Sequence, residues 1–196
     1  MNSAPASKLI VIAVLCSVLF FLALTLLEAI PEIPVDIDFK AFFIPLAFVV
    51  LLPVGRPTFA AALGASLGEF LRDMLEGYEI DDPIGAIGYV VGFTLAGYII
   101  RNRPLSKVRL VIAAVLAGFV QAVIEAASFV IFSEEILEVA VWSAIGNTIT
   151  HGILMGAIPL VLIIPRLHGR IERYMGFAPR GLAAPRVPHM APGRVG

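Results

Sequence analysis

The 196-residue sequence is poor in the residues from which disulfide frameworks, metal centres and nucleophilic active sites are built. It has one cysteine, Cys16, and three histidines. A single cysteine excludes an intramolecular disulfide, and no cysteine and histidine cluster has the spacing of a zinc site. The sequence also lacks a phosphate-binding P-loop and a His-Glu-x-x-His motif. We therefore predict a protein that is not an enzyme, has no catalytic residues, metal or cofactor, and does not hydrolyse ATP itself.

Charged residues are also scarce, because they make up 15% of the chain while 59% of it is hydrophobic. The mean hydropathy is +0.95. Such a composition is not typical of a soluble domain and predicts an integral protein of the lipid bilayer. The net charge of −1 masks opposite charges on the two membrane faces and therefore says nothing about nucleic acid. No nucleic-acid motif is present, and we predict no nucleic-acid partner.

Six apolar segments predict an all-α membrane protein with six transmembrane helices. The segments are residues 9–30, 39–54, 58–75, 84–100, 108–132 and 139–165. Most approach the roughly 20 residues that a bilayer core requires, although the second and third are short. The first segment is longer than the apolar core of a signal peptide and lacks a clear cleavage site, so we expect it to remain as a helix.

Basic and acidic strips alternate between these segments. All 14 lysines and arginines except Lys40 and Arg72 lie on one side. The positive-inside rule assigns that side to the cytoplasm. We therefore predict a multi-pass protein of the cell (plasma) membrane with both termini cytoplasmic.

The chain divides into a membrane domain and a tail. Residues 1–177 contain the six segments, whereas residues 178–196 are rich in Pro, Gly and Arg and show no periodicity. This composition predicts a disordered cytoplasmic tail.

Small residues recur at every fourth position in the last four segments and predict tight helix packing. They are Ala60, Gly64 and Gly68; Gly88, Gly92 and Ala96; Ala114, Gly118, Ala122 and Ala126; and Thr148, Gly152 and Gly156.

Polar side chains gather in the outer halves of three predicted helices, which indicates a pocket that opens to the outside. The predicted substrate-binding residues are Glu69, Gln121, Glu125, Trp142, Asn147 and His151. Ser143, Asn147 and His151 form one stripe at helical spacing. The buried carboxylate of Glu125 needs a proton, water or a cation, and we expect its basic neighbours to be His151 and Arg72.

Each of these residues also has a purely structural interpretation. Arg72 and Asp73 can pair with each other at the headgroup level. Trp142 suits the aromatic belt at the membrane interface. Gln121 and Asn147 can serve as hydrogen bonds between helices, and His151 as a structural donor rather than a metal ligand.

Residues 52–75, LPVGRPTFAAALGASLGEFLRDML, followed by the glycine-rich segment 84–100, resemble the substrate-binding S component of energy-coupling factor (ECF) transporters. The resemblance covers about residues 8–175 in length, number of helices and orientation. It implies a six-helix subunit that captures a vitamin or related micronutrient from outside. A separate transmembrane T component and two cytoplasmic ATPase subunits would supply the energy.

The resemblance also implies two contacts. The family uses Ala-x-x-x-Ala in the first helix to contact the T component, and this chain has Ala13 and Ser17 at that spacing. The family's first outer loop closes over the substrate, which here implies residues 31–39. A carboxylate beside Trp142 and amide groups would suit a flat, hydrogen-bonding heterocycle, including one with a cationic centre.

Three other functions fit the same residues. A proton-coupled secondary transporter would use Glu125 as its coupling carboxylate. A non-transporting scaffold of a membrane complex would use the polar groups only to fix helix packing. An intramembrane enzyme would need a catalytic group that the motifs do not supply.

Overall fold

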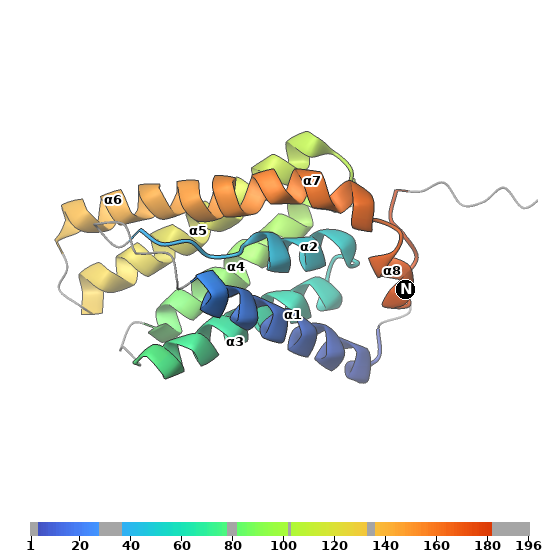
Figure 1. Cartoon of the computed structure of the whole chain (residues 1–196), viewed down its shortest axis with the longest axis horizontal. Helices are drawn as coiled ribbons and strands as arrows, with labels where there is room; N and C mark the ends of the chain where they lie inside the picture. The colour runs from blue at the N-terminus through green and yellow to red at the C-terminus, as the bar shows by residue number, and fades with distance from the viewer. Residues whose placement is uncertain (1–3, 28–36, 78–81, 102, 133–135, 182–196) are drawn as a thin grey trace, which may run out of the picture.

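The computed structural model describes residues 4–27, 37–77, 82–101, 103–132 and 136–181, and the regular elements in these ranges are helices (Figure 1). They are α1 (Ala6–Leu27), α2 (Phe43–Leu51), α3 (Arg56–Glu76), α4 (Asp82–Ile100), α5 (Lys107–Phe132), α6 (Leu137–Asn147), η1 (Thr148–Ala157), α7 (Ile158–Leu167) and α8 (Ile171–Tyr174). The predicted all-α class is therefore confirmed for the described part of the chain. Pro31 and Pro34 of the predicted outer loop, and most of the predicted tail, lie outside the described residues.

Within the described residues, four helices are long and apolar enough to cross a membrane. They are α1, α4, α5 and the continuous helix Leu137–Leu167 that α6, η1 and α7 form together. Helix α3 has 21 residues, but Glu69, Arg72 and Asp73 lower the hydropathy of its second half. These helices make a membrane location plausible. That the chain crosses the membrane six times stays a prediction.

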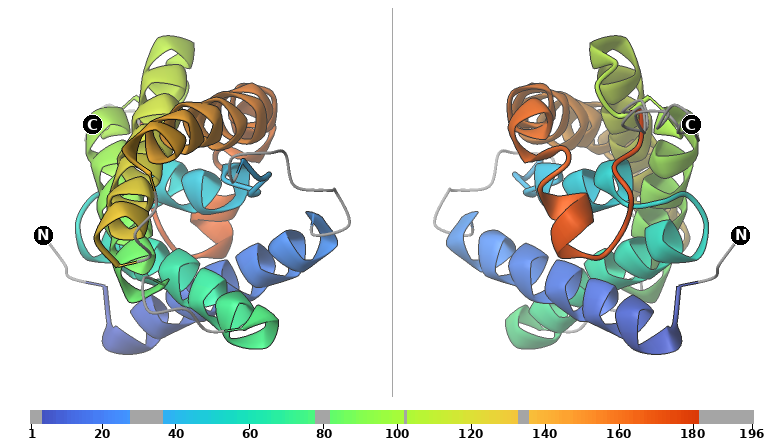
Figure 2. Two further views of the ribbon diagram at one scale, coloured as in Figure 1. Left: turned by 90° about the vertical axis from the view of Figure 1, so that its left-hand side faces the viewer. Right: turned by 90° about the vertical axis from the view of Figure 1, so that its right-hand side faces the viewer.

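The second predicted span, residues 39–54, differs most from the structure. Its helix, α2, has only nine residues and is about 14 Å long, which is less than the roughly 30 Å of a bilayer core. It ends at Leu51 because Pro53 disfavours helical backbone in Leu52, whose ψ is 152°. Its Leu46 and Val49 are fully buried. Helix α2 packs against α1, α3, α4, η1 and α7, and so lies inside the bundle (Figure 2).

The small-residue stripes lie where helix backbones approach closely, as predicted. Gly64 and Gly68 face the backbone of α1. A Cβ atom added to Gly118 would lie 2.7 Å from the Cα atom of Gly152. Any side chain there would overlap backbone atoms, so these glycines set the distances between α1 and α3 and between α5 and η1.

The last long helix contains a π-helical stretch of ten residues, Thr148–Ala157. Such wide turns are rare and frequently occur at functional sites. Asn147 immediately precedes the stretch and His151 lies within it. The stretch packs on α5 and α2, so both residues face the interior of the bundle.

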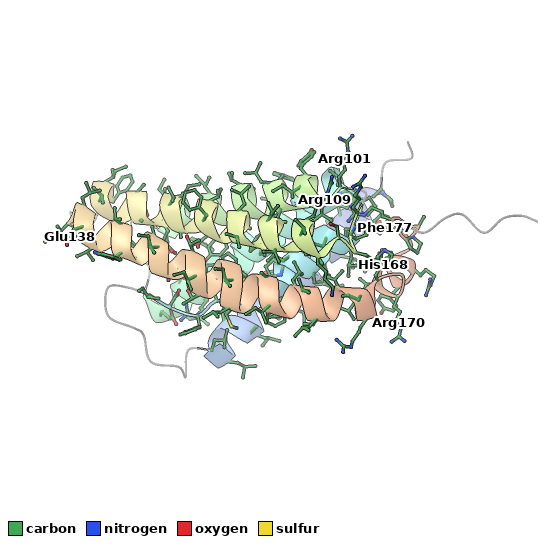
Figure 3. All side chains as sticks on the ribbon, turned by 90° about the horizontal axis from the view of Figure 1, so that it is seen from above. Arg101, Arg109, Glu138, His168, Arg170 and Phe177 are labelled. Carbon is green, nitrogen blue, oxygen red and sulfur yellow. The ribbon has the colours of Figure 1, made fainter. Side chains whose placement is uncertain are left out.

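The two ends of the bundle differ in charge. Figure 3 shows Arg101, Arg109, His168 and Arg170 at one end and Glu138 at the other. At the basic end Arg180 donates hydrogen bonds to the carbonyls of Val50 and Arg101. The first residues of the predicted tail are therefore attached to the bundle, and the remainder, from residue 182, lies outside the described residues.

Candidate functional site

A cavity of about 150 Å³ lies near the C-terminal ends of α3 and α5 and the N-terminal end of α4. This is the end of the bundle away from Arg101 and Arg109 (Figure 3). The lining residues are Asp38, Lys40, Glu69, Arg72, Asp73, Glu76, Asp82, Gly85, Ala86, Tyr89, Glu125, Phe129 and Asn147. Six of them are carboxylates and two are cations, so the cavity has a large excess of formal negative charge.

Lys40 is the central cation of this cluster. Its Nζ lies 2.9 Å from Glu69 Oε1, 3.1 Å from Glu125 Oε1 and 3.4 Å from Asp38 Oδ2. The ammonium also lies 5.7 Å from the centre of the Tyr89 ring. With 9% of its side chain exposed, Lys40 has little water around it. Three carboxylates therefore replace the hydration shell of the ammonium.

Lys40 reaches the cluster because it precedes α2 on non-helical backbone. The expectation that only His151 and Arg72 lie near enough to pair with Glu125 is wrong, since Lys40 is its partner. Arg72 instead pairs with Glu76, one turn along α3, and not with Asp73 as one interpretation of the sequence had it.

Asp38 connects Lys40 to a second, more deeply buried layer. His151 Nε2 lies 2.6 Å from Asp38 Oδ1, and His151 Nδ1 lies 3.2 Å from Gln121 Oε1. The Asp38 backbone N–H donates to Asn147 Oδ1 at 3.1 Å. Burial raises the pKa of Asp38, but the charges of Lys40 and His151 outweigh this effect and hold the pKa well below its usual range. Asp38 is accordingly a stable carboxylate that fixes the chain entering α2.

The predicted site residues fall into three groups: residues that line the cavity, residues that are buried without lining it, and Trp142. Glu69, Glu125 and Asn147 come together around the cavity. Gln121 and His151 are fully buried and do not line the cavity. Gln121 contacts His151, and His151 contacts the lining residue Asp38.

Trp142 is placed elsewhere. It is 55% exposed and does not line the cavity. Successive residues of a helix point about 100° apart, so Trp142 points away from the direction of the buried Ser143. Trp142 lies on the same exposed face as Ile145 and Ile149. Trp142 is therefore not the aromatic partner of a heterocycle in this cavity, whose aromatic lining residues are Tyr89 and Phe129. The interpretation as an interfacial residue fits the position of Trp142.

One oxygen of Glu69 has no partner within the described ranges. Glu69 is 3% exposed, and its Oε1 accepts from Lys40 and, at 2.9 Å, from the Tyr89 hydroxyl. Its Oε2 is buried without a hydrogen bond. The Nε of Arg72 is likewise buried and without a partner among these residues. Buried polar groups are normally paired, so both atoms can bind a hydrogen-bonding group in the cavity.

Residues 64–68 read Gly-Ala-Ser-Leu-Gly, which has the Gly-x-Ser-x-Gly spacing of a serine-hydrolase nucleophile elbow. The structure shows no such elbow there. Ser66 lies within α3 rather than at a strand-to-helix turn, and its hydroxyl donates to the Ala86 carbonyl at 2.9 Å. The serine connects α3 to α4 at this position. No group of three or more potential metal ligands occurs in the part of the chain that the structure describes.

Ala13 and Ser17, the expected partner contacts, face α3 of the same chain. Gly64 approaches the carbonyl of Ala13, and Gly68 approaches that of Ser17. Ser17 is buried by this packing. The contact that the structure shows for these residues is internal, and their contact with a T component stays a prediction.

The sequence analysis did not identify Asp38, Lys40 and Tyr89 as site residues. One signal for Lys40 was present, because it is one of only two basic residues on the acidic side and directly precedes an apolar run. A lysine in that position requires a counter-ion. No comparable signal for Tyr89 is present in the sequence, because its role depends on the packing of α4 against α3.

Comparison with protein families gives one match. A model described as a family of unknown function, DUF8171, matches residues 11–191 and therefore nearly the whole chain. Comparisons with curated proteins and with solved structures give no match.

Proposed function

We propose that this chain, which belongs to the DUF8171 family, captures a small cationic solute from one side of a membrane. The observation that carries the proposal is the acidic cavity within the helix bundle, in which a fully buried oxygen of Glu69 has no partner in the described structure. Ionisable groups inside membrane proteins are costly and mark solute or ion pathways. Here they converge from α3, α4, α5 and the chain before α2.

The charge of the cavity favours a cation. The described lining residues include six carboxylates and two cations, Lys40 and Arg72. Of the six, Glu69 is buried and Glu76 is exposed to solvent. A bound cation would reduce the repulsion among the carboxylates that water screens least. An anionic solute would add to the repulsion, which argues against carboxylate-bearing vitamins.

The size of the cavity favours a small solute. Its volume of about 150 Å³ lies below the roughly 300–1,000 Å³ of pockets that hold drug-sized ligands. An engineered cavity of about that size binds benzene in another protein. This narrows the expected micronutrient to a solute of about six non-hydrogen atoms.

The transport role follows from the resemblance to the S components of ECF importers. As such a subunit, the chain would bind the solute and depend on a T component and two ATPase subunits for energy. The missing P-loop agrees with this division of labour. The positive-inside rule would place the cavity on the outer side of the plasma membrane and both termini in the cytoplasm.

The first test is the thermal stability of the detergent-solubilised protein with small amines, quaternary ammonium ions, carboxylates and neutral solutes. A ligand that binds only the folded state raises the melting temperature. We expect small amines to do so in the wild type and not in Glu69→Gln. Glu138→Gln is the matched control, because Glu138 is exposed and does not line the cavity. Stabilisation by anions alone, or equal responses of wild type and Glu69→Gln, would contradict the proposal.

A proton-coupled carrier is a second candidate, and the contact between Lys40 and Glu125 favours it. Protonation of Glu125 would remove one of the three carboxylates around Lys40 and loosen the cluster. Uptake into proteoliposomes of the purified chain distinguishes the two candidates. Uptake driven by a proton gradient without ATPase subunits supports the carrier, whereas binding without uptake supports the S component.

A further inference from the structure

Two unpaired polar atoms on α3 indicate which hydrogen-bonding groups the solute carries, in addition to its charge. One is the acceptor Oε2 of Glu69 and the other is the donor Nε of Arg72. Both residues line the cavity. They are three positions apart on one helix and therefore lie on the same face, separated by a rise of about 4.5 Å.

The acceptor needs a donor that Lys40 does not provide. Lys40 and Tyr89 both donate to Oε1 of Glu69, at 2.9 Å each, and leave Oε2 free. A carboxylate oxygen in a cavity lined by six carboxylates favours a charged donor, and an ammonium group fits best.

The donor needs an acceptor that Glu76 does not provide. Glu76 pairs with Nη2 of Arg72, and this contact leaves Nε buried and unpaired. A carboxylate on the solute could accept from this N–H, but the excess negative charge of the cavity would repel it. A neutral acceptor, such as a hydroxyl or carbonyl oxygen, avoids this repulsion.

We propose that the solute is a small amine that also carries a hydroxyl or carbonyl group two or three carbons from its nitrogen. Its ammonium donates to Glu69 Oε2, and its oxygen accepts from Arg72 Nε. This inference depends on the proposed function, because it assigns the class of solute for the same cavity.

Four probes of similar size test it in the wild-type protein: 3-aminopropan-1-ol, n-butylamine, 1,3-diaminopropane and β-alanine. Calorimetric titration at fixed pH and ionic strength gives their affinities. We expect 3-aminopropan-1-ol to bind about ten- to a hundredfold more tightly than n-butylamine, because its oxygen accepts a hydrogen bond from the charged guanidinium of Arg72. We expect β-alanine to bind most weakly, because its carboxylate enters an acidic cavity.

The variant Arg72→Lys isolates the donor. Lysine keeps the positive charge that pairs with Glu76 but has no N–H at the position of Nε. We expect the affinity for n-butylamine to be retained and the preference for 3-aminopropan-1-ol to disappear. In Glu69→Gln both amines should lose affinity together.

The outcomes separate this inference from the proposed function. One contrary result is that amines bind the wild type with no preference for 3-aminopropan-1-ol, and another is that 1,3-diaminopropane binds more tightly than 3-aminopropan-1-ol. Either result would show that the assigned solute class is wrong, while the proposed capture of a small cation would stand. A preference that persists in Arg72→Lys also overturns the inference. If no amine binds at all, both are wrong. The affinities of the four probes are ranked on the wild-type protein, so this test does not depend on whether a variant folds.

Discussion

At the scale of single residues, Lys40 governs the electrostatics of the site. Three carboxylates surround its ammonium within 3.4 Å, and the side chains of Lys40 and Glu69 are 9% and 4% exposed. Breaking a buried ion pair by removing one partner leaves an uncompensated charge and costs about 3–5 kcal/mol. The cluster therefore makes residues 38–40 part of the folded bundle, although they lie outside its helices.

We predict that Lys40→Met lowers the stability of the folded protein by about 3 kcal/mol or more, because the variant leaves Asp38, Glu69 and Glu125 without their shared counter-ion. The measurement is thermal unfolding in detergent at neutral pH. Lys107→Met is the control, since Lys107 is exposed at the basic end of the bundle.

The double variant Lys40→Met with Glu125→Gln removes one of the stranded charges. It should recover part of the lost melting temperature, because contacting groups do not contribute additively. A single variant as stable as the control would show that the cluster does not stabilise the fold.

At the scale of helices, the contact between α5 and η1 places Gln121 and Glu125 beside Asn147 and His151. At Gly118 in this contact, an added Cβ atom would lie 2.7 Å from both the N and Cα atoms of Gly152. Backbone atoms on both sides cannot move aside as a flexible side chain can. The geometry of the cavity thus depends on a position that carries no polar group.

We predict that Gly118→Ala lowers the melting temperature and weakens binding of small amines, because α5 must move away from η1. Gly85→Ala in α4 is the matched control for stability, since the nearest atom to its added Cβ is Glu125 Oε1 at 4.0 Å. Alanine is favoured over glycine within a helix by about 1 kcal/mol, so Gly85→Ala should be neutral or stabilising. Equal melting temperatures for the two variants would show that the α5–η1 contact can relax.

At the scale of the whole molecule, charge is divided between the two ends of the bundle. The cavity and Glu138 lie at one end, and Arg101, Arg109 and Arg170 lie at the other (Figure 3). In a membrane, the positive-inside rule orients such a bundle with the basic end in the cytoplasm. The cavity would then receive its solute from outside.

We predict that an impermeant maleimide added to intact cells labels a cysteine at position 138 and not one at position 170. Both sites are exposed, and the background variant Cys16→Ser removes the only native cysteine, which is buried in α1. Both positions should be labelled after the membrane is permeabilised. Labelling of position 170 alone in intact cells would reverse the orientation and place the cavity at the cytoplasmic side.

Much of the helical architecture could be predicted from the sequence, because it depends on local properties of the chain. The apolar runs predicted α1, α4, α5 and the last long helix to within a few residues. The spacing of Gly64, Gly68, Gly118 and Gly152 predicted where helices come closest. Hydropathy and small-residue spacing act within one helix, so they can be read along the chain.

The membership of the site was decided only by the tertiary structure. Glu125 is 85 residues from Lys40 along the chain, and His151 is 113 residues from Asp38. No local pattern links residues so far apart. Apolarity alone predicted the second segment over residues 39–54, whereas the folded chain keeps Lys40 outside α2, where its ammonium contacts Glu125 of α5. The sequence determined where helices form, and the packing of those helices decided which charges meet, because the free energy of a buried charge depends on its neighbours in space.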